Sequence, residues 1–172
     1  IDDDVTVKLV SGIRGLQQLI SFHLFGENSM GRAGCEAFAT LLRDPNCKLK
    51  AISIGCCTSI DDDCATILAN SLECNSELEK VQLDANQTIT MRGWEDFANV
   101  LCNESSVNGT YLSNHTLNGL GASGTNLPPK LSSLLELNSN TNKKCVAIQK
   151  ILRHHSHLDM LPFFEWDLKV LP

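Results

Sequence analysis

Residues 46–54 read Asn-Cys-Lys-Leu-Lys-Ala-Ile-Ser-Ile, and a related phrase returns twice further along the chain. It reads Asn-Ser-Glu-Leu-Glu-Lys-Val-Gln-Leu at 75–83 and Asn-His-Thr-Leu-Asn-Gly-Leu-Gly-Ala at 114–122, with a looser copy at 19–24. The shared pattern is LxxLxL, whose last two apolar positions are two residues apart. That spacing is the period of a β-strand with one buried face, so each phrase predicts a short strand.

The residues that follow each strand repeat as well, with apolar or small side chains at helical spacing. Their columns are Met30, Ile60 and Ile89; Gly34, Cys64 and Gly93; Phe38, Leu68 and Phe97; Ala39, Ala69 and Ala98; and Leu42, Leu72 and Leu101. The step is 30 residues from the first copy to the second and 29 from the second to the third. Each unit is therefore predicted to be a strand, a turn and a helix, and stacking of the units buries the faces that one unit leaves open.

This pattern resembles the leucine-rich repeats of the ribonuclease-inhibitor-like class, whose unit of about 28 or 29 residues carries a helix. The resemblance implies an α/β leucine-rich-repeat solenoid that forms a short horseshoe arc, with parallel strands on the concave face and helices on the convex face. Such repeats place Asn or Cys three residues after the motif, where the side chain satisfies backbone groups at the bend. Here that slot holds Glu27, Cys57, Asn86 and Thr125, so the first and last units are atypical.

The repeat arc is expected to cover residues 1–126 in about four units, with a helical C-terminal cap over 127–172. Between the third and fourth units the step grows to 39 residues, which predicts an insertion near 103–113. An alternative register keeps the 29-residue step and places the fourth strand on Val107, Thr110 and Leu112.

Within the cap, the prolines near 128 break the chain, and short helices are expected over 131–137 and 143–155. Residues 160–172 are rich in Phe, Trp and Leu, which can cover the last apolar layer of the arc. At the other end, residues 1–18 are expected to form the helix of a preceding unit, so that the chain begins in the middle of a repeat.

Several phrases in the second half go beyond a generic repeat. They are Ile-Thr-Met-Arg-Gly-Trp-Glu-Asp-Phe at 89–97, Tyr-Leu-Ser-Asn-His-Thr-Leu at 111–117, Leu-Leu-Glu-Leu-Asn at 134–138, Asn-Lys-Lys-Cys-Val-Ala-Ile-Gln-Lys-Ile-Leu at 142–152, and Pro-Phe-Phe-Glu-Trp-Asp-Leu-Lys-Val-Leu-Pro at 162–172. These phrases resemble the large diatom (stramenopile algal) leucine-rich-repeat family over most of residues 20–172. The resemblance implies a soluble interaction module and brings no catalytic residue with it.

Composition narrows the function classes. The 172 residues are 42% hydrophobic, which suits one domain with a core. With 14 basic and 20 acidic residues the net charge is -6, which argues against nucleic acid as a partner. No apolar run approaches the roughly 20 residues that span a bilayer, so no membrane insertion is expected. The eight cysteines contain no CxxC pair, and several occupy apolar repeat columns, so we expect reduced thiols and an intracellular, cytoplasmic location.

The concave sheet face is the expected binding surface, because strand side chains that point away from the core line it. The predicted partner-binding residues are Ser21, His23, Phe25, Ser53, Lys80, Gln82 and Asp84 on this face, with Tyr111 from the insertion. Phe25 is the large apolar residue among the sheet positions, and aromatic side chains are enriched among interface anchors. The alternative is that Phe25 folds into the first turn. The many small residues suit a broad protein surface better than a deep small-molecule pocket.

The sequence predicts no catalytic, cofactor or metal site. His154, His155 and His157 lie close together, but neighbouring histidines on a helix point in different directions, and no acidic or thiolate partner is near in sequence. We expect a solvated helix end there. The three aspartates at 61–63 lack the EF-hand pattern and are expected to form the N-cap and first turn of a helix.

These observations favour a non-catalytic protein–protein interaction module or scaffold with an unidentified protein partner. One alternative is a GTPase-activating protein of the Ran type, which uses the same repeat class and acts on a small GTPase. No residue stands out for that role. A third hypothesis is a structural subunit of a larger assembly.

Overall fold

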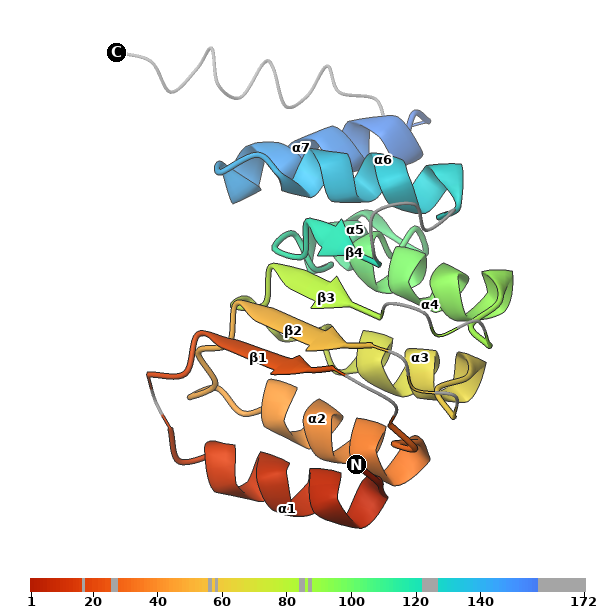
Figure 1. Ribbon diagram of the computed structural model, residues 1–172. Helices are drawn as coiled ribbons and strands as arrows, with labels where there is room; N and C mark the ends of the chain where they lie inside the picture. The colour runs from red at the N-terminus through yellow and green to blue at the C-terminus, as the bar shows by residue number, and fades with distance from the viewer. Residues whose placement is uncertain are drawn as a thin grey trace.

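The computed structural model describes residues 1–16, 18–25, 28–55, 57, 59–83, 86, 88–121 and 127–157 (Figure 1). It is an α/β protein with a four-stranded parallel sheet in the order β1-β2-β3-β4. The elements in chain order are α1 (Asp3–Ile13), β1 (Ser21–Leu24), α2 (Arg32–Leu42), β2 (Ala51–Ile54), α3 (Asp62–Asn70), β3 (Lys80–Gln82), α4 (Met91–Leu101), α5 (Val107–Tyr111), β4 (Gly119–Leu120), α6 (Pro129–Asn138) and α7 (Lys143–His154). Figure 1 shows α1 at the β1 end of the sheet, and α6 and α7 at the β4 end.

The sheet has the register that the repeat predicts. One column runs through Phe22, Ile52, Val81 and Leu120, and its last three side chains are buried. The preceding column, which is more exposed, runs through Ser21, Ala51, Lys80 and Gly119. The alternation gives each strand a core face and an outer face, as a period of two requires.

The apolar columns of the repeat form the core. The buried side chains include Met30, Ile60 and Ile89; Phe38, Leu68 and Phe97; and Leu42, Leu72 and Leu101. Trp94 is also buried, and its ring centroid lies 6.1 Å from that of Phe97. Neighbouring units pack through α1 and α2, α2 and α3, and α3 and α4. The hydrophobic contacts between successive units therefore hold the sheet and its helices together.

Two neighbouring aspartates cap the start of α3 and connect it with the start of α4. Asp61 caps α3, where its Oδ1 accepts a hydrogen bond from the Cys64 amide at 3.0 Å, as the run at 61–63 predicts. Asp62 reaches α4, and its Oδ1 accepts from the backbone N–H groups of Thr90 at 2.7 Å and Gly93 at 3.2 Å. A Cβ at Gly93 would lie 2.7 Å from that oxygen, so glycine there permits the close approach.

The bend after the strands is closed by side-chain amides. The Asn86 Oδ1 accepts from the Cys57 amide at 2.9 Å, and the Asn86 Nδ2 donates to the Ile54 carbonyl oxygen at 3.1 Å. This is the role that the predicted slot requires, because each bond satisfies a backbone group at the bend. Thr125, the fourth predicted residue of the slot, lies outside the described residues.

The first unit departs from the predicted slot. Asn28, and not Glu27, forms the bridge with Cys57 that places it in this column. Ser21 pairs with Ala51 at an offset of 30, whereas Asn28 pairs with Cys57 at an offset of 29. One additional residue in the first bend therefore shifts the slot, and a fixed three-residue count misses it. Glu27 itself lies outside the described residues.

The fourth strand follows Leu117. Gly119 pairs with Lys80 in register, so β4 continues the sheet after the longer step. The alternative register is wrong, because Val107 and Thr110 belong to α5, a short helix within the inserted segment.

The helices after the sheet begin and end close to their predicted ranges of 131–137 and 143–155. α6 packs against α4, and α7 packs against α5. The aromatic stretch predicted to complete the cap, 160–172, lies outside the described residues. Among the described helices, none has the length and apolar character needed to cross a membrane.

Candidate protein-binding face and polar clusters

Strand side chains that point away from the core form a surface that we call the outer sheet face. It is defined by Ser21, His23, Phe25, Lys80 and Gln82, all of which are exposed. The register aligns Ser21 with Lys80 through β2, and it aligns His23 with Gln82 in the same way. The structure thus brings five of the predicted partner-binding residues onto one face.

Phe25 directly follows β1 and is 67% exposed. Its ring stacks on that of His23, with ring centroids 5.7 Å apart and an interplanar angle of 11°. It is therefore not folded into the first turn. Stacking holds the Phe25 ring on the outer sheet face and leaves most of its apolar surface open to solvent.

The remaining predicted residues do not join this surface. Ser53 is 0% exposed, and it lies in the register between His23 and Gln82, whose longer side chains flank it. Partner contact through Ser53 stays a prediction, and in this structure its side chain is buried. Tyr111 is 53% exposed, but it belongs to α5, which packs against α7 rather than the sheet. Asp84 lies outside the described residues.

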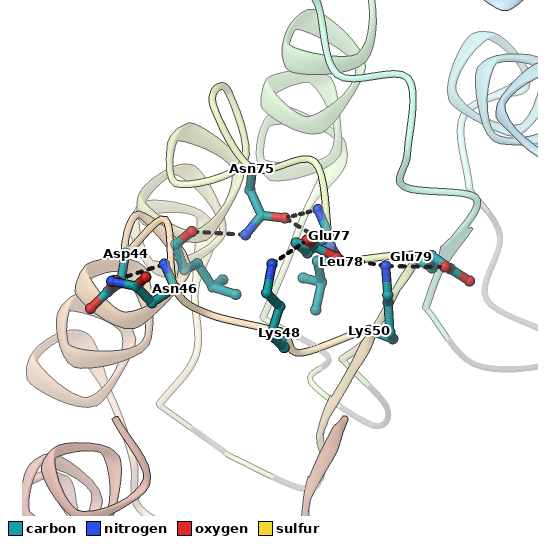
Figure 2. Close-up of polar contacts among 9 residues, drawn as sticks. Asp44, Asn46, Lys48, Lys50, Asn75, Glu77, Leu78 and Glu79 are labelled. Atoms are coloured by element: carbon teal, nitrogen blue, oxygen red, sulfur yellow. Dashed lines mark hydrogen bonds and ion pairs between the residues drawn. The ribbon is translucent and has the colours of Figure 1, made fainter. Parts of the chain in front are cut away.

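Four charged side chains form a row before β2 and β3, which we call the strand-start charge row (Figure 2). The Glu77 carboxylate accepts from the Nζ of Lys48 at 2.9 Å and from the Nζ of Lys50 at 2.7 Å. A longer ion pair of 3.7 Å joins Lys50 to Glu79. The hydrogen bonds from the two lysines lower the pKa of Glu77 to about 2, and the bond to Glu77 raises the pKa of Lys50. The row therefore links two neighbouring units electrostatically.

The sequence contains a signal for this row in the charges of matching repeat positions. Lys48 and Lys50 occupy the same repeat positions as Glu77 and Glu79, at the common offset of 29 residues. Opposite charges in matching positions of adjacent units meet when the units stack, as cross-strand pairs do in a sheet.

A second feature missed by the sequence analysis is a column of buried asparagines. Asn75 donates to the Leu42 carbonyl oxygen at 2.8 Å, and its Oδ1 accepts from the Leu78 amide at 2.7 Å (Figure 2). Asn114 and Asn138 continue the column in the following units. These are the asparagines of the repeated Asn-x-x-Leu phrase and of the end of α6. Their amides satisfy buried backbone groups between units, so their role is structural.

Lys150 on α7 is fully buried. Its Nζ donates to the carbonyl oxygens of Leu101 at 2.6 Å and Asn114 at 3.0 Å. The amine also lies 3.1 Å from the Nδ1 of His115, which can accept because the other ring nitrogen faces the Tyr111 carbonyl oxygen at 3.0 Å. Burial lowers the pKa of Lys150 to about 7, although three acceptors match the three N–H donors of the charged amine. Lys150 therefore anchors α7 to the end of α4.

The sequence predicted a solvated helix end at the end of α7, and this prediction is wrong. His155 is buried with its Nε2 at 2.8 Å from the Thr110 Oγ1, and the His154 Nδ1 lies 2.9 Å from the Glu104 Oε1. The fold also brings Cys102 to this place. Ligand atoms of Cys102, Glu104 and His154 all lie within 4.8 Å of one another. The carboxylate and the cysteine sulfur that are absent near the histidines in sequence are thus supplied by Glu104 and Cys102, which are 50 and 52 residues before His154.

Comparison with known proteins adds one observation on the fold. No family model and no curated protein matches this chain. Among solved structures, leiomodin-1 actin-binding site 2 is similar with a TM-score of 0.55 and 16% sequence identity. The match covers 86% of this chain and 95% of that chain. At this identity the likeness shows a shared fold, so the class defined here is an α/β protein with a parallel sheet covered by helices.

Proposed function

We propose that this chain is a leucine-rich-repeat solenoid of the ribonuclease-inhibitor-like class that works as a non-catalytic protein-interaction module. It presents its outer sheet face to a partner protein. The observation that carries the proposal is Phe25, which is 67% exposed and lies on that face beside the His23 ring. Removal of a large aromatic side chain from water by a partner lowers the free energy of the complex. Aromatic anchors with polar surroundings are typical of protein interfaces.

The repeat geometry supports the finer fold assignment. Successive strands pair in parallel at offsets of 30 and 29 residues, each followed by a helix that packs on the next. Asn86, which follows β3, forms hydrogen bonds with two backbone groups of the bend after β2 and so links the two units. A stack of such units leaves one long sheet face uncovered, and repeat proteins use surfaces of this kind for binding.

The chemistry of the face favours a broad contact. Lys80 and Gln82 supply exposed polar side chains on β3, at the other side of the buried Ser53 from the aromatic pair. The strand-start charge row borders these strands and offers further charged groups. An apolar centre with a polar margin matches the anatomy of protein–protein interfaces.

The solved neighbour suggests which partner to test first. Its name states that it is an actin-binding site, and the shared fold is the reason to test actin. Monomeric actin is therefore the first purified probe. The proposal itself requires a protein partner on the outer sheet face and does not depend on actin.

Site-specific photo-crosslinking locates the contact. A photoreactive phenylalanine derivative replaces Gln82 on the outer sheet face, and in a matched protein it replaces Arg92, which is exposed on α4. Each protein is illuminated in a lysate of the source cells and, separately, with purified actin, and the adducts are identified by mass spectrometry. We expect a dominant protein adduct from position 82 that position 92 does not give.

The outcome that discards the proposal is an adduct formed equally well from both positions, or formed only from position 92. An adduct with another protein but not with actin supports the interaction surface and removes actin as the partner.

A further inference from the structure

The place where α4 ends and α7 ends holds three side chains with metal-ligand chemistry. Cys102 directly follows α4 and is buried, Glu104 is two residues further on, and His154 is the last residue of α7. One sulfur, oxygen or nitrogen atom from each lies within 4.8 Å of the other two. We propose that Cys102, Glu104 and His154 form a zinc-binding site, which goes beyond the proposed interaction role.

The donor set favours zinc over other common divalent cations. A thiolate, an imidazole and a carboxylate are the ligands that Zn²⁺ takes, whereas Ca²⁺ and Mg²⁺ require oxygen ligands. Ligand atoms around a tetrahedral zinc ion lie roughly 3.3 to 3.8 Å apart, from its bond lengths. The separations here need side-chain adjustments of about an ångström to reach that geometry. Three protein ligands leave a fourth position for water or for a group of a partner.

The surroundings give the ion a route to the site. Glu104 lines an open groove of about 730 Å³ beside α3, α4 and the inserted segment, together with Cys74, Asp96, Asn103 and Leu112. Glu104 lines this groove, whereas Cys102 is buried.

Binding has a defined proton balance. The Cys102 thiol forms a sulfur–zinc bond and releases its proton to solvent. The imidazole of His154 coordinates through a nitrogen lone pair and keeps one proton on its other nitrogen. The Glu104 carboxylate exchanges its contact with His154 for one with the ion. Zinc affinity therefore rises with pH, and binding holds the end of α7 to the residues that follow α4.

A substitution of Lys130 can distinguish this site from incidental zinc binding elsewhere on the protein. Its Nζ lies 2.8 Å from the Glu104 Oε1, so the ammonium group competes with a cation for the same carboxylate oxygen. Lys130→Met removes that competition and also removes a positive charge that would repel the zinc ion. We therefore expect Lys130→Met to bind zinc more tightly than the wild type, an effect that damage to the fold would not produce.

The test is a titration of the full chain with zinc sulfate after chelator treatment, in competition with a chromophoric zinc indicator. We expect one equivalent bound, with affinity reduced in Cys102→Ser, Glu104→Gln and His154→Asn. Each reduction should exceed the roughly 10- to 100-fold that loss of an outer-shell partner costs. Cobalt substitution should show thiolate-to-metal charge-transfer absorption that is lost in Cys102→Ser. Thermal unfolding followed by circular dichroism shows whether each variant folds.

Matched controls use exposed groups of the same type outside the trio and outside the groove, namely Cys145→Ser and His157→Asn. These variants should bind zinc as the wild type does. Absence of stoichiometric binding in the wild type overturns the proposal, and so does an affinity that falls in the controls but not in the trio variants. Both results leave the outer sheet face untested, so the two proposals fail independently.

Discussion

The side-chain amide of Asn114 donates a hydrogen bond to the backbone carbonyl oxygen of Asn75 at 2.8 Å, and both residues are buried. Asn114 also donates to the Leu72 carbonyl oxygen at 2.9 Å, and its own Oδ1 accepts from the Leu117 amide at 2.9 Å. One side chain therefore joins the start of the third unit to the residues just before β4. It does so across the enlarged step that contains α5.

Replacement of this amide should destabilise the fold. Asn114→Ala leaves several buried backbone groups without partners, so we expect the free energy of unfolding to fall by about 3 kcal/mol. Urea denaturation of the variant and the wild type measures the difference. Asn99→Ala, on the exposed side of α4, should change it by less than about 0.5 kcal/mol. An equal effect of the two substitutions would show that the buried column is dispensable.

Periodicity predicted the parts of the fold that repeat. The 29- and 30-residue steps placed Met30, Ile60 and Ile89 in one buried column, and they aligned Ser21 with Ala51 across the first two strands. These predictions succeeded because stacked units repeat their inward contacts, so matching sequence positions meet matching environments.

Contacts that do not repeat could not be predicted in this way. The slot moved from Glu27 to Asn28 because the first bend has one additional residue. Ser53 is buried because of the side chains on the neighbouring strands, which a column of residue types does not reveal. The partners of His154 come from a loop 50 residues earlier, and that proximity depends on how α7 packs.

The strand-start charge row gives an acid-sensitive contribution to stability. The folded pKa of Glu77 is about 2, below its ordinary value of 4.5, so the stabilisation is present above pH 4.5 and is lost as the pH falls through 2. Glu77→Gln should lower the free energy of unfolding at pH 7 by about 1 kcal/mol or less, because solvent screens these half-exposed ions.

Denaturant unfolding at pH 7 and pH 3 tests this expectation. The difference between wild type and Glu77→Gln should shrink at the lower pH. Glu36→Gln removes an exposed pair with Arg32 within one helix and serves as the control, with a smaller effect at both pH values. A difference that grows towards pH 3 would contradict the lowered pKa of Glu77.

Lys150 should make stability rise with pH above neutrality. Its folded pKa is about 7 against an ordinary 10.5, and its titratable neighbours are Cys102, Lys143 and His115. Between pH 7 and 10 the unfolded chain holds a proton that the folded chain lacks, so the free energy of unfolding increases with pH. Lys150→Met should flatten this slope, whereas Lys144→Met, exposed on the same helix, should keep it. Urea unfolding at pH 7 and 9 in the presence of a chelator measures both slopes, and a steep slope in Lys150→Met would refute the assignment.

Ser53 offers a substitution that should stabilise the protein. Its hydroxyl is buried, and within the described residues it has no hydrogen-bond partner. Ser53→Ala removes that unsatisfied group, so we expect a gain of about 1 kcal/mol in the free energy of unfolding with partner binding unchanged. Thermal unfolding and an equilibrium binding assay report the two quantities. A loss of stability would mean that the hydroxyl is satisfied by a bound water molecule.

The central claim is that the outer sheet face binds the partner, and the affinity of Phe25→Ser for the crosslinked partner tests it most directly. Met91→Ser is the matched control, because Met91 is 55% exposed at the start of α4 on the helical side. Loss of an aromatic anchor that contributes about 2 kcal/mol to binding corresponds to a roughly 30-fold higher dissociation constant. The account predicts that loss for Phe25→Ser and wild-type affinity for Met91→Ser, whereas equal affinities of the two variants would contradict it.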